Sequence, residues 1–397
     1  MLLEYFYETT GIYLLSSRLF STGVATVASF ILAMLLFPPY IRFLLKMQVS
    51  SEFDNAAGAP GAAAGAGSGA AKAPAGPVMP AGILFFFIII AVTLAAVRIN
   101  AYVVSALIIY CFFSIIGAAD DIAKVLNQRK VARGLMSQKD YQYKADGISS
   151  TLRLALYLLI SLIVAVLAYK YIPNINKNIN VPFFSVDKWY PSLVVWLFIP
   201  LMTLTIAVMA NGVNFTDGFD TLTTVPSITC LTFLGIISFI SSNSIWSSYL
   251  LIPYIPNLEE ILPLIGAVSG TLLAYLWFNS PPSTIIMGDS GSVGLGGFIG
   301  ILFIFSKSEF YLPIVAFIFL LEFCSVFMQM GWFKLTKKRI FLCAPIHHHF
   351  QFGMRKSGKY GEGPLGEFRI KSKIMWRFHI TSVILLIVGL VMFLKVR

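Results

Sequence analysis

The chain has 397 residues, of which 57% are hydrophobic and 12% are charged. A soluble globular protein carries about twice that charged fraction, so the composition excludes an ordinary soluble domain. The net charge of +11 could suggest a nucleic-acid partner, but the basic residues gather in loops between apolar runs. We therefore expect no nucleic-acid partner and predict a polytopic membrane protein.

Apolar runs that could cross a membrane recur along most of the chain. A bilayer core about 30 Å thick takes roughly 20 apolar residues per helix, and lipid leaves no partner for an exposed backbone, so each span should be helical. The predicted fold class is all-α, with residues 1–397 forming a single integral membrane domain. The ten expected spans are 19–45, 78–97, 101–119, 150–170, 192–210, 221–242, 260–278, 290–306, 310–331 and 374–395.

The loops between these spans differ in charge. When they are assigned alternately to the two sides, most of the 29 lysines and arginines fall on one side. Cytoplasmic loops carry such an excess, so this side is predicted to be cytoplasmic and both termini periplasmic. Two expected cytoplasmic segments stand out: a flexible Ala/Gly-rich loop at 55–77 and a loop at 332–373 that carries three consecutive histidines.

Four polar patches abut apolar spans on the predicted cytoplasmic side. Polar residues at membrane depth are costly and usually mark a functional site, although each patch alone could be a solvated loop. The candidate residues are Asp120, Asp121 and Lys124 in GAADDIAK, Asn211, Asn214, Asp217 and Asp220 in MANGVNFTDGFDTL, Asn279 and Asp289 in FNSPPSTIIMGDSGSVGLGG, and His347, His348 and His349 in APIHHHFQF.

These residue types suit phosphoryl transfer. Carboxylates from several spans fit Mg²⁺, which takes one or two carboxylates together with substrate phosphates. The glycines of MGDSGS allow backbone N–H groups to approach a phosphate at a helix start. Three consecutive histidines point in different directions, so contacts to phosphate or sugar are favoured over a zinc site. Glu322 could be an acid of the site or a structural group, and His379 is expected to be structural.

The order and spacing of four motifs resemble one enzyme family along nearly the whole chain. The motifs are DDxxK, NxVNxTDGxD, FNxxP…MGDxGSxxLGG and FKLTxKRIFxxAPIHHHF. They are similar to those of the phospho-N-acetylmuramoyl-pentapeptide transferases, in the superfamily of polyprenyl-phosphate N-acetylhexosamine-1-phosphate transferases. The resemblance implies Mg²⁺-dependent transfer of phospho-MurNAc-pentapeptide from UDP-MurNAc-pentapeptide to undecaprenyl phosphate, which yields lipid I and UMP. It also implies a homodimer in the bacterial inner membrane, with a cytoplasmic active site.

The resemblance assigns roles to the residues of these motifs. Asp289 would be catalytic and the Mg²⁺ ligand, Asp120 and Asp121 would act at the lipid phosphate with Asp120 as the base, and His347 would also be catalytic. The residues expected to bind substrate are Lys124, Lys144, Asn211, Asn214, Asp217, Gly218, Phe219, Asp220, Asn279, His348 and His349.

Several positions depart from the family pattern, mostly on the nucleotide side. Ile286 stands where an aromatic residue would stack on uracil, and Gln351 stands where a glutamate usually follows the histidines. The segment 353–373 is longer than common, and PVMPAG at 77–82 replaces the usual PTMGG. Two alternatives stay open: a transferase that moves HexNAc-1-phosphate onto the same lipid, and a secondary transporter, whose acids would lie nearer the membrane midplane.

Overall fold

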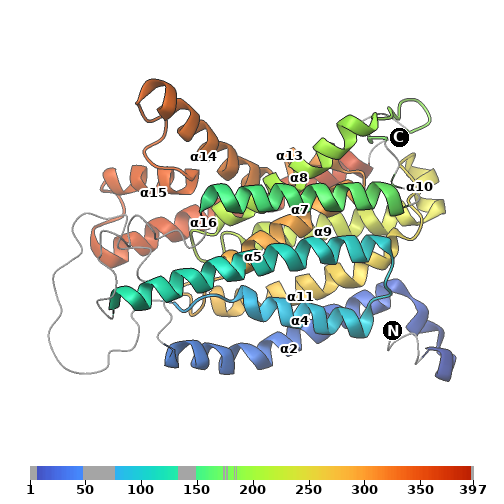
Figure 1. Cartoon of the computed structure of the whole chain (residues 1–397), viewed down its shortest axis with the longest axis horizontal. Coiled ribbons are helices and arrows are strands. Elements are labelled where there is room, and N and C mark those ends of the chain that lie inside the picture. Colours follow the sequence, from blue (N-terminus) through green and yellow to red (C-terminus); the bar gives the residue numbers. More distant parts are fainter. Residues whose placement is uncertain are drawn as a thin grey trace.

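The structure is a computed structural model that describes residues 7–47, 77–132, 149–172, 175, 178–182, 184 and 186–394. Helices dominate this part of the chain, and the β-structure described there is limited to two isolated bridges. The long helices run side by side along one axis (Figure 1). The main helices are α2 (Arg18–Lys46), α4 (Gly82–Ala96), α5 (Ala101–Ala132), α7 (Ser150–Tyr171), α8 (Val195–Thr216), α9 (Thr224–Ser242), α10 (Ser244–Leu250), α11 (Leu262–Asn279), α12 (Asp289–Phe305), α13 (Leu312–Val315), α14 (Phe317–Thr336), α15 (Ile346–Lys356) and α16 (Gly363–Leu394).

The all-α membrane fold is confirmed. Within the described residues, eight helices are long and apolar enough to cross a membrane, and α4 and α12 are shorter apolar helices. Together they coincide with the ten expected spans. The described ends of the chain lie at the same end of the bundle (Figure 1), as an even number of crossings requires.

The carboxyl-terminal third differs from the expected pattern. The segment 332–373, expected to be a loop, contains α15 and the first turns of α16, which begins at Gly363 and not at 374. The ninth span begins at Phe317, after the separate short helix α13. The loop expected at 55–77 lies outside the described residues, apart from Pro77.

The glycine-rich helix α12 forms the centre of the bundle and packs against α5 on one side and α8 on the other. Every residue from Ser290 to Phe305 is buried. A Cβ atom at Gly294 would lie 2.1 Å from the Ser114 hydroxyl oxygen, and one at Gly296 would lie 2.5 Å from the Met209 carbonyl oxygen. The absent side chains therefore allow close helix packing, which fixes the position of Asp289 at the start of α12.

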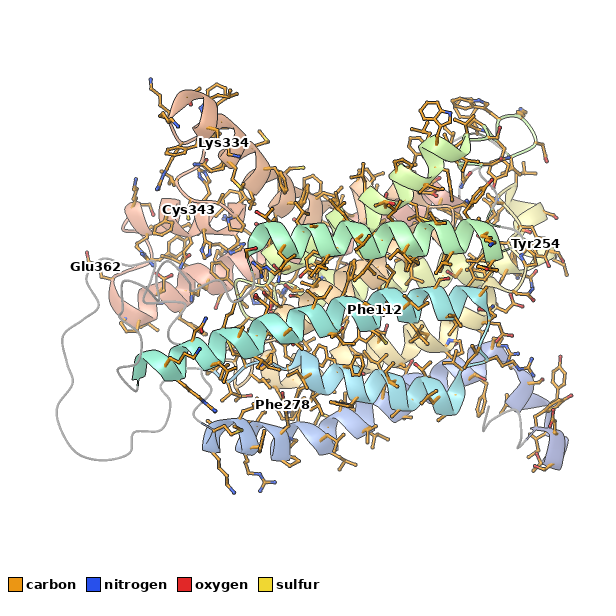
Figure 2. All side chains as sticks on the ribbon, viewed as in Figure 1. Phe112, Tyr254, Phe278, Lys334, Cys343 and Glu362 are labelled. Carbon is orange, nitrogen blue, oxygen red and sulfur yellow. The ribbon has the colours of Figure 1, made fainter. Side chains whose placement is uncertain are left out.

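Helix α14 leans away from the bundle, while α15 and the start of α16 lie at the end opposite the chain termini (Figure 1). Lys334, Cys343 and Glu362 mark this end in Figure 2, and Tyr254 marks the other. The exposed side chains of α14 include Phe327, Met328 and Trp332. The predicted patch with three consecutive histidines, which lies on α15, is therefore at this end of the bundle.

Candidate active site

Two carboxylates from different helices share two cations. Asp120 lies on α5, and Asp289 is the first residue of α12. Lys124 Nζ lies 3.1 Å from one oxygen of each carboxylate. Arg153 Nη1, from α7, lies 3.0 Å from Asp120 Oδ2 and 2.7 Å from Asp289 Oδ2. Lys124 was expected here, whereas Arg153 was not among the residues selected from the sequence.

Asp121, the neighbour of Asp120, has a different set of partners. Its two carboxylate oxygens accept the backbone N–H groups of Asp289 at 3.1 Å and Ser290 at 2.9 Å. Helix α12 begins after Gly288, which has no side chain to cap it, so these donors would otherwise lack helical partners. Asp121 thus acts as the helix cap and holds Asp289 in place, while Asp120 faces the cations.

The last turns of α8 supply the next polar groups. The Asn214 side-chain amide donates to Asp289 Oδ1 at 2.7 Å and contacts the Ser292 hydroxyl oxygen at 3.0 Å. Asn211, one turn earlier, donates instead to the Ala207 carbonyl oxygen of its own helix at 2.8 Å. Asn214 therefore belongs to the carboxylate cluster, and Asn211 shows a structural contact.

Asp217 follows directly after α8 and lies near the other acids. Burial raises its pKa, and the negative charges of Asp289 and Asp121 raise it further, to about 7. Asp220 lies one turn further on and accepts a hydrogen bond from the Ser283 hydroxyl at 2.8 Å. The turn at Asp217 and Gly218, called the DG turn below, thus places the Asp217 carboxylate near the cluster. It also holds the Asp220 carboxylate against the loop before α12.

Asn279, expected to bind substrate, connects two backbone segments. Its oxygen accepts the N–H of Thr221 at 2.7 Å, and its amide donates to the Ile285 carbonyl at 2.9 Å. Thr221 has a positive φ of 60°, and its carbonyl oxygen lies 3.1 Å from His379 Nε2. Asn279 is 4% exposed, so its contacts shape the site from behind, and His379 has the structural contact expected of it.

The three histidines have three different environments. His347 is 1% exposed, and its Nδ1 lies 3.2 Å from the carboxylate of Glu322, which is itself fully buried. His349 Nδ1 accepts the Leu342 N–H at 3.1 Å. Of the three, His348 is the one that lines the cavity described below. The catalytic role expected for His347 stays a prediction, and its observed contact is the buried pair with Glu322.

The tight packing of His347 explains the glycine beside it. A Cβ atom at Gly218 would lie 2.3 Å from His347 Nε2. The His347 and Phe219 rings also pack edge to face, with a centroid distance of 4.7 Å. His347 therefore packs the α14–α15 segment against the DG turn. This packing requires a residue without a side chain at position 218.

A cavity of about 910 Å³ opens beside these groups. It brings together most of the residues selected from the sequence, with additional groups from α16. Those selected residues are Lys124, Asn214, Asp217, Gly218, Phe219, Asp220, Asp289 and His348. Glu367 and Lys371 also line the cavity and had no sequence signal beyond being charged, whereas Lys144 lies outside the described residues.

The carboxylates fit a divalent cation that takes few protein ligands. Among the residues that the structure describes, no three His, Cys, Asp or Glu side chains are arranged as a complete metal site. Mg²⁺ usually keeps several waters and binds through one or two carboxylates plus substrate phosphates. Asp289 and Asp217 would be such ligands, and the mutual repulsion that raises the pKa of Asp217 is the kind that a divalent cation relieves.

The fold and this site together define a membrane-embedded enzyme that transfers a phosphate-linked group. Residues 102–307 match the family model described as glycosyl transferase family 4. The chain is 34% identical over its full length to the phospho-N-acetylmuramoyl-pentapeptide-transferase of a Nitratiruptor species, of which it covers 100%. The enzyme of the same name from Rickettsia bellii is 35% identical over 98% of this chain and 97% of its own. That of Sulfurimonas denitrificans is 39% identical over 68% of this chain and 71% of its own.

The chain therefore belongs to glycosyl transferase family 4, among the phospho-N-acetylmuramoyl-pentapeptide-transferases. It is a multi-pass membrane transferase. This excludes the secondary transporter as its class.

Proposed function

We propose that the protein transfers phospho-MurNAc-pentapeptide from UDP-MurNAc-pentapeptide to undecaprenyl phosphate, forming lipid I and UMP for peptidoglycan synthesis. The observation that carries this proposal is the pair Asp120 and Asp289, joined through Lys124 and Arg153 beside the cavity. Two cations and convergent carboxylates suit a reaction in which positioning and charge stabilisation supply most of the catalysis. The names of the full-length relatives support the choice of substrates.

In the net reaction, the bond between the β-phosphorus and the bridging oxygen of the UDP unit breaks. A bond forms between that phosphorus and an oxygen of the lipid phosphate, and UMP leaves with the bridging oxygen. Lys124 and Arg153 would balance the negative charge of the phosphates, and Asp120 would accept a proton from the lipid phosphate. Mg²⁺, held by Asp289 with Asp217, would neutralise charge on the diphosphate. Asn214 would keep the Asp289 carboxylate oriented.

We also propose a topology and an assembly. The basic loops support placing the active site at the cytoplasmic face of the bacterial inner membrane, with both termini in the periplasm. The site lies at the end of the bundle opposite the described chain ends (Figure 1), which agrees with that topology. A homodimer is proposed from the family resemblance, and the mass of the detergent-solubilised protein would test it.

The decisive experiment measures UMP release from UDP-MurNAc-pentapeptide and undecaprenyl phosphate, with and without Mg²⁺. Asp289→Asn keeps the shape of the side chain and removes its charge, so it should lose nearly all activity. Asp187→Asn is the matched control because Asp187 is exposed in the segment between α7 and α8, at the other end of the bundle. Mg²⁺-dependent release in the wild type and in the control, but not in Asp289→Asn, would support the proposal.

A parallel reaction with UDP-GlcNAc tests the alternative sugar-phosphate transferase. Turnover of UDP-GlcNAc without turnover of UDP-MurNAc-pentapeptide would move the assignment to that branch. Release that does not need Mg²⁺ would refute the proposed metal site while leaving the transferase class in place.

A further inference from the structure

A hydrogen-bonded network on α15 and α16 reaches the cavity at His348. Gln351 lies one turn after His348, and its side-chain oxygen is 2.8 Å from His348 Nδ1. The amide nitrogen of Gln351 donates to one oxygen of Glu367. Arg355 holds the other Glu367 oxygen through Nε at 3.1 Å and Nη2 at 2.6 Å. Gln351 is 7% exposed, so its two ends have little access to other partners.

The chemistry of the three groups permits one arrangement of protons. An ionised carboxylate only accepts hydrogen bonds, and the two contacts from Arg355 favour the ionised form of Glu367. The Gln351 amide must therefore turn its NH₂ group toward Glu367, which leaves its oxygen facing the imidazole. An amide oxygen also only accepts, so His348 Nδ1 must carry the hydrogen. In a neutral ring the other nitrogen, Nε2, then has a free lone pair.

We infer that Glu367 is a positioning residue that acts through Gln351 to hold His348 as its Nδ1–H tautomer, so that Nε2 accepts a hydrogen bond from the substrate. Because the partner must be a donor, it is a hydroxyl or N–H group of the substrate, not an ionised phosphate oxygen. This inference rests on the proposed function for the substrate, but the state of the His348 ring does not.

The charges around His348 agree with a neutral ring. Burial lowers the pKa of His348, and the adjacent His347 lowers it further, to about 4. Lys371 acts in the same direction, whereas Gln351 and Glu367 act in the opposite one. The ring would thus bring no positive charge to the diphosphate near pH 7. The sequence left contacts of the histidines to phosphate or to sugar open, and a neutral His348 that accepts through Nε2 disfavours the phosphate contact.

The first test needs no substrate. The chain has four histidines, so ¹⁵N-histidine labelling and long-range ¹H–¹⁵N correlation of the detergent-solubilised protein give few signals. The signal missing in His348→Asn identifies His348. We expect the Nδ1–H pattern in the wild type at pH 7 and a shift toward mixed tautomers in Glu367→Gln, because the Gln351 amide can then turn over. An Nε2–H pattern in the wild type would overturn the inference.

The second test measures UMP release. Losing one neutral hydrogen bond weakens binding about three- to tenfold, so Glu367→Gln should raise KM for UDP-MurNAc-pentapeptide by that factor. The swap Gln351→Glu with Glu367→Gln should restore both KM and the Nδ1–H signal, because a carboxylate at 351 accepts from Nδ1 and an amide at 367 donates to it. Glu362→Gln is the matched control, since Glu362 is an exposed acid a few residues earlier.

The outcomes separate this inference from the proposed function. The positioning role is refuted if Glu367→Gln has the same spectrum and the same KM as Glu362→Gln. It is also refuted if the swap fails to restore the Nδ1–H signal or fails to restore KM. If the wild type shows the Nδ1–H tautomer but releases no UMP, the proposed function fails, the assigned tautomer stands, and the substrate contact is refuted.

Discussion

The joint between α5 and the start of α12 offers the sharpest test of how the site is positioned. Gly117 lies on α5, and a Cβ atom there would be 2.3 Å from the Asp289 carbonyl oxygen and 2.7 Å from the Ser290 backbone nitrogen. These neighbours are backbone atoms, which cannot swing aside as a flexible side chain would. Gly117→Ala must therefore push α5 and the first turn of α12 apart.

The size of that displacement follows from the same contacts. An ordinary van der Waals contact begins at 3.4 Å, so the backbone at Asp289 must shift by about 1 Å. Misplacing a catalytic group by 1 Å can cost about a hundredfold in rate, and overpacking a tight interior costs about 1–3 kcal/mol. We expect Gly117→Ala to lose about a hundredfold in kcat and to unfold at a lower temperature.

The assay combines UMP release with thermal unfolding in detergent. Gly331→Ala is the control: position 331 lies within α14, and a Cβ there meets nothing within 4 Å. In a helix, alanine is more favourable than glycine by about 0.8–1 kcal/mol, so this variant should be active and slightly more stable. If Gly117→Ala has the kcat and the melting temperature of the wild type, the close contact between α5 and the backbone of Asp289 does not position the site, and the reasoning is refuted.

Three further predictions concern the acids and the histidines. Asp121→Asn should leave one N–H at the start of α12 without its acceptor and lower the free energy of unfolding by about 1–3 kcal/mol, measured against Asp187→Asn, which changes an exposed aspartate far from this cap. Glu322→Gln should weaken the contact to buried His347 and lower the melting temperature, with Glu362→Gln as the exposed control. The pKa of His348 is lowered, so this ring gains charge only as pH falls through about 4. His348→Asn should therefore reduce kcat/KM by a factor that is constant from pH 6 to 8. A factor that changes across that range would contradict a neutral His348.

The membrane spans could be predicted because their signal is local. Length and apolarity determine each one, and the ten expected runs coincide with helices. The amphipathic helix α15 and the early start of α16 could not be found this way. Both lie in the segment 332–373, whose charges and glycines resemble those of a loop. Their helical form follows from packing against each other and against α14, which no short window of sequence contains.

The carboxylates of the site were also accessible from the sequence, since polar residues next to apolar spans are rare enough to select. Their partners were not. Arg153 lies 33 residues from Asp120 and 136 from Asp289, and its basic side chain is equally consistent with a cytoplasmic loop. Gln351 was visible as a departure from the family pattern, but the contact with Glu367 exists only after α15 and α16 pack together. Tertiary contacts decide which polar residues bind a substrate and which support those that do.

The charge of the cluster has a consequence for the order of binding. Among the described side chains, Asp120, Asp121, Asp217 and Asp289 converge, and the basic groups that contact them are Lys124 and Arg153. Both proposed substrates carry phosphates, so further negative charge must approach a cluster in which, among the side chains that the structure describes, acids outnumber cations. Repulsion of this kind is strong where water is scarce. Asp289 and Asp217 would hold a divalent cation at this point, and its positive charge would offset the repulsion between the acids and the diphosphate. If the proposed Mg²⁺ site is correct, we expect the nucleotide to bind more tightly with Mg²⁺ than without it.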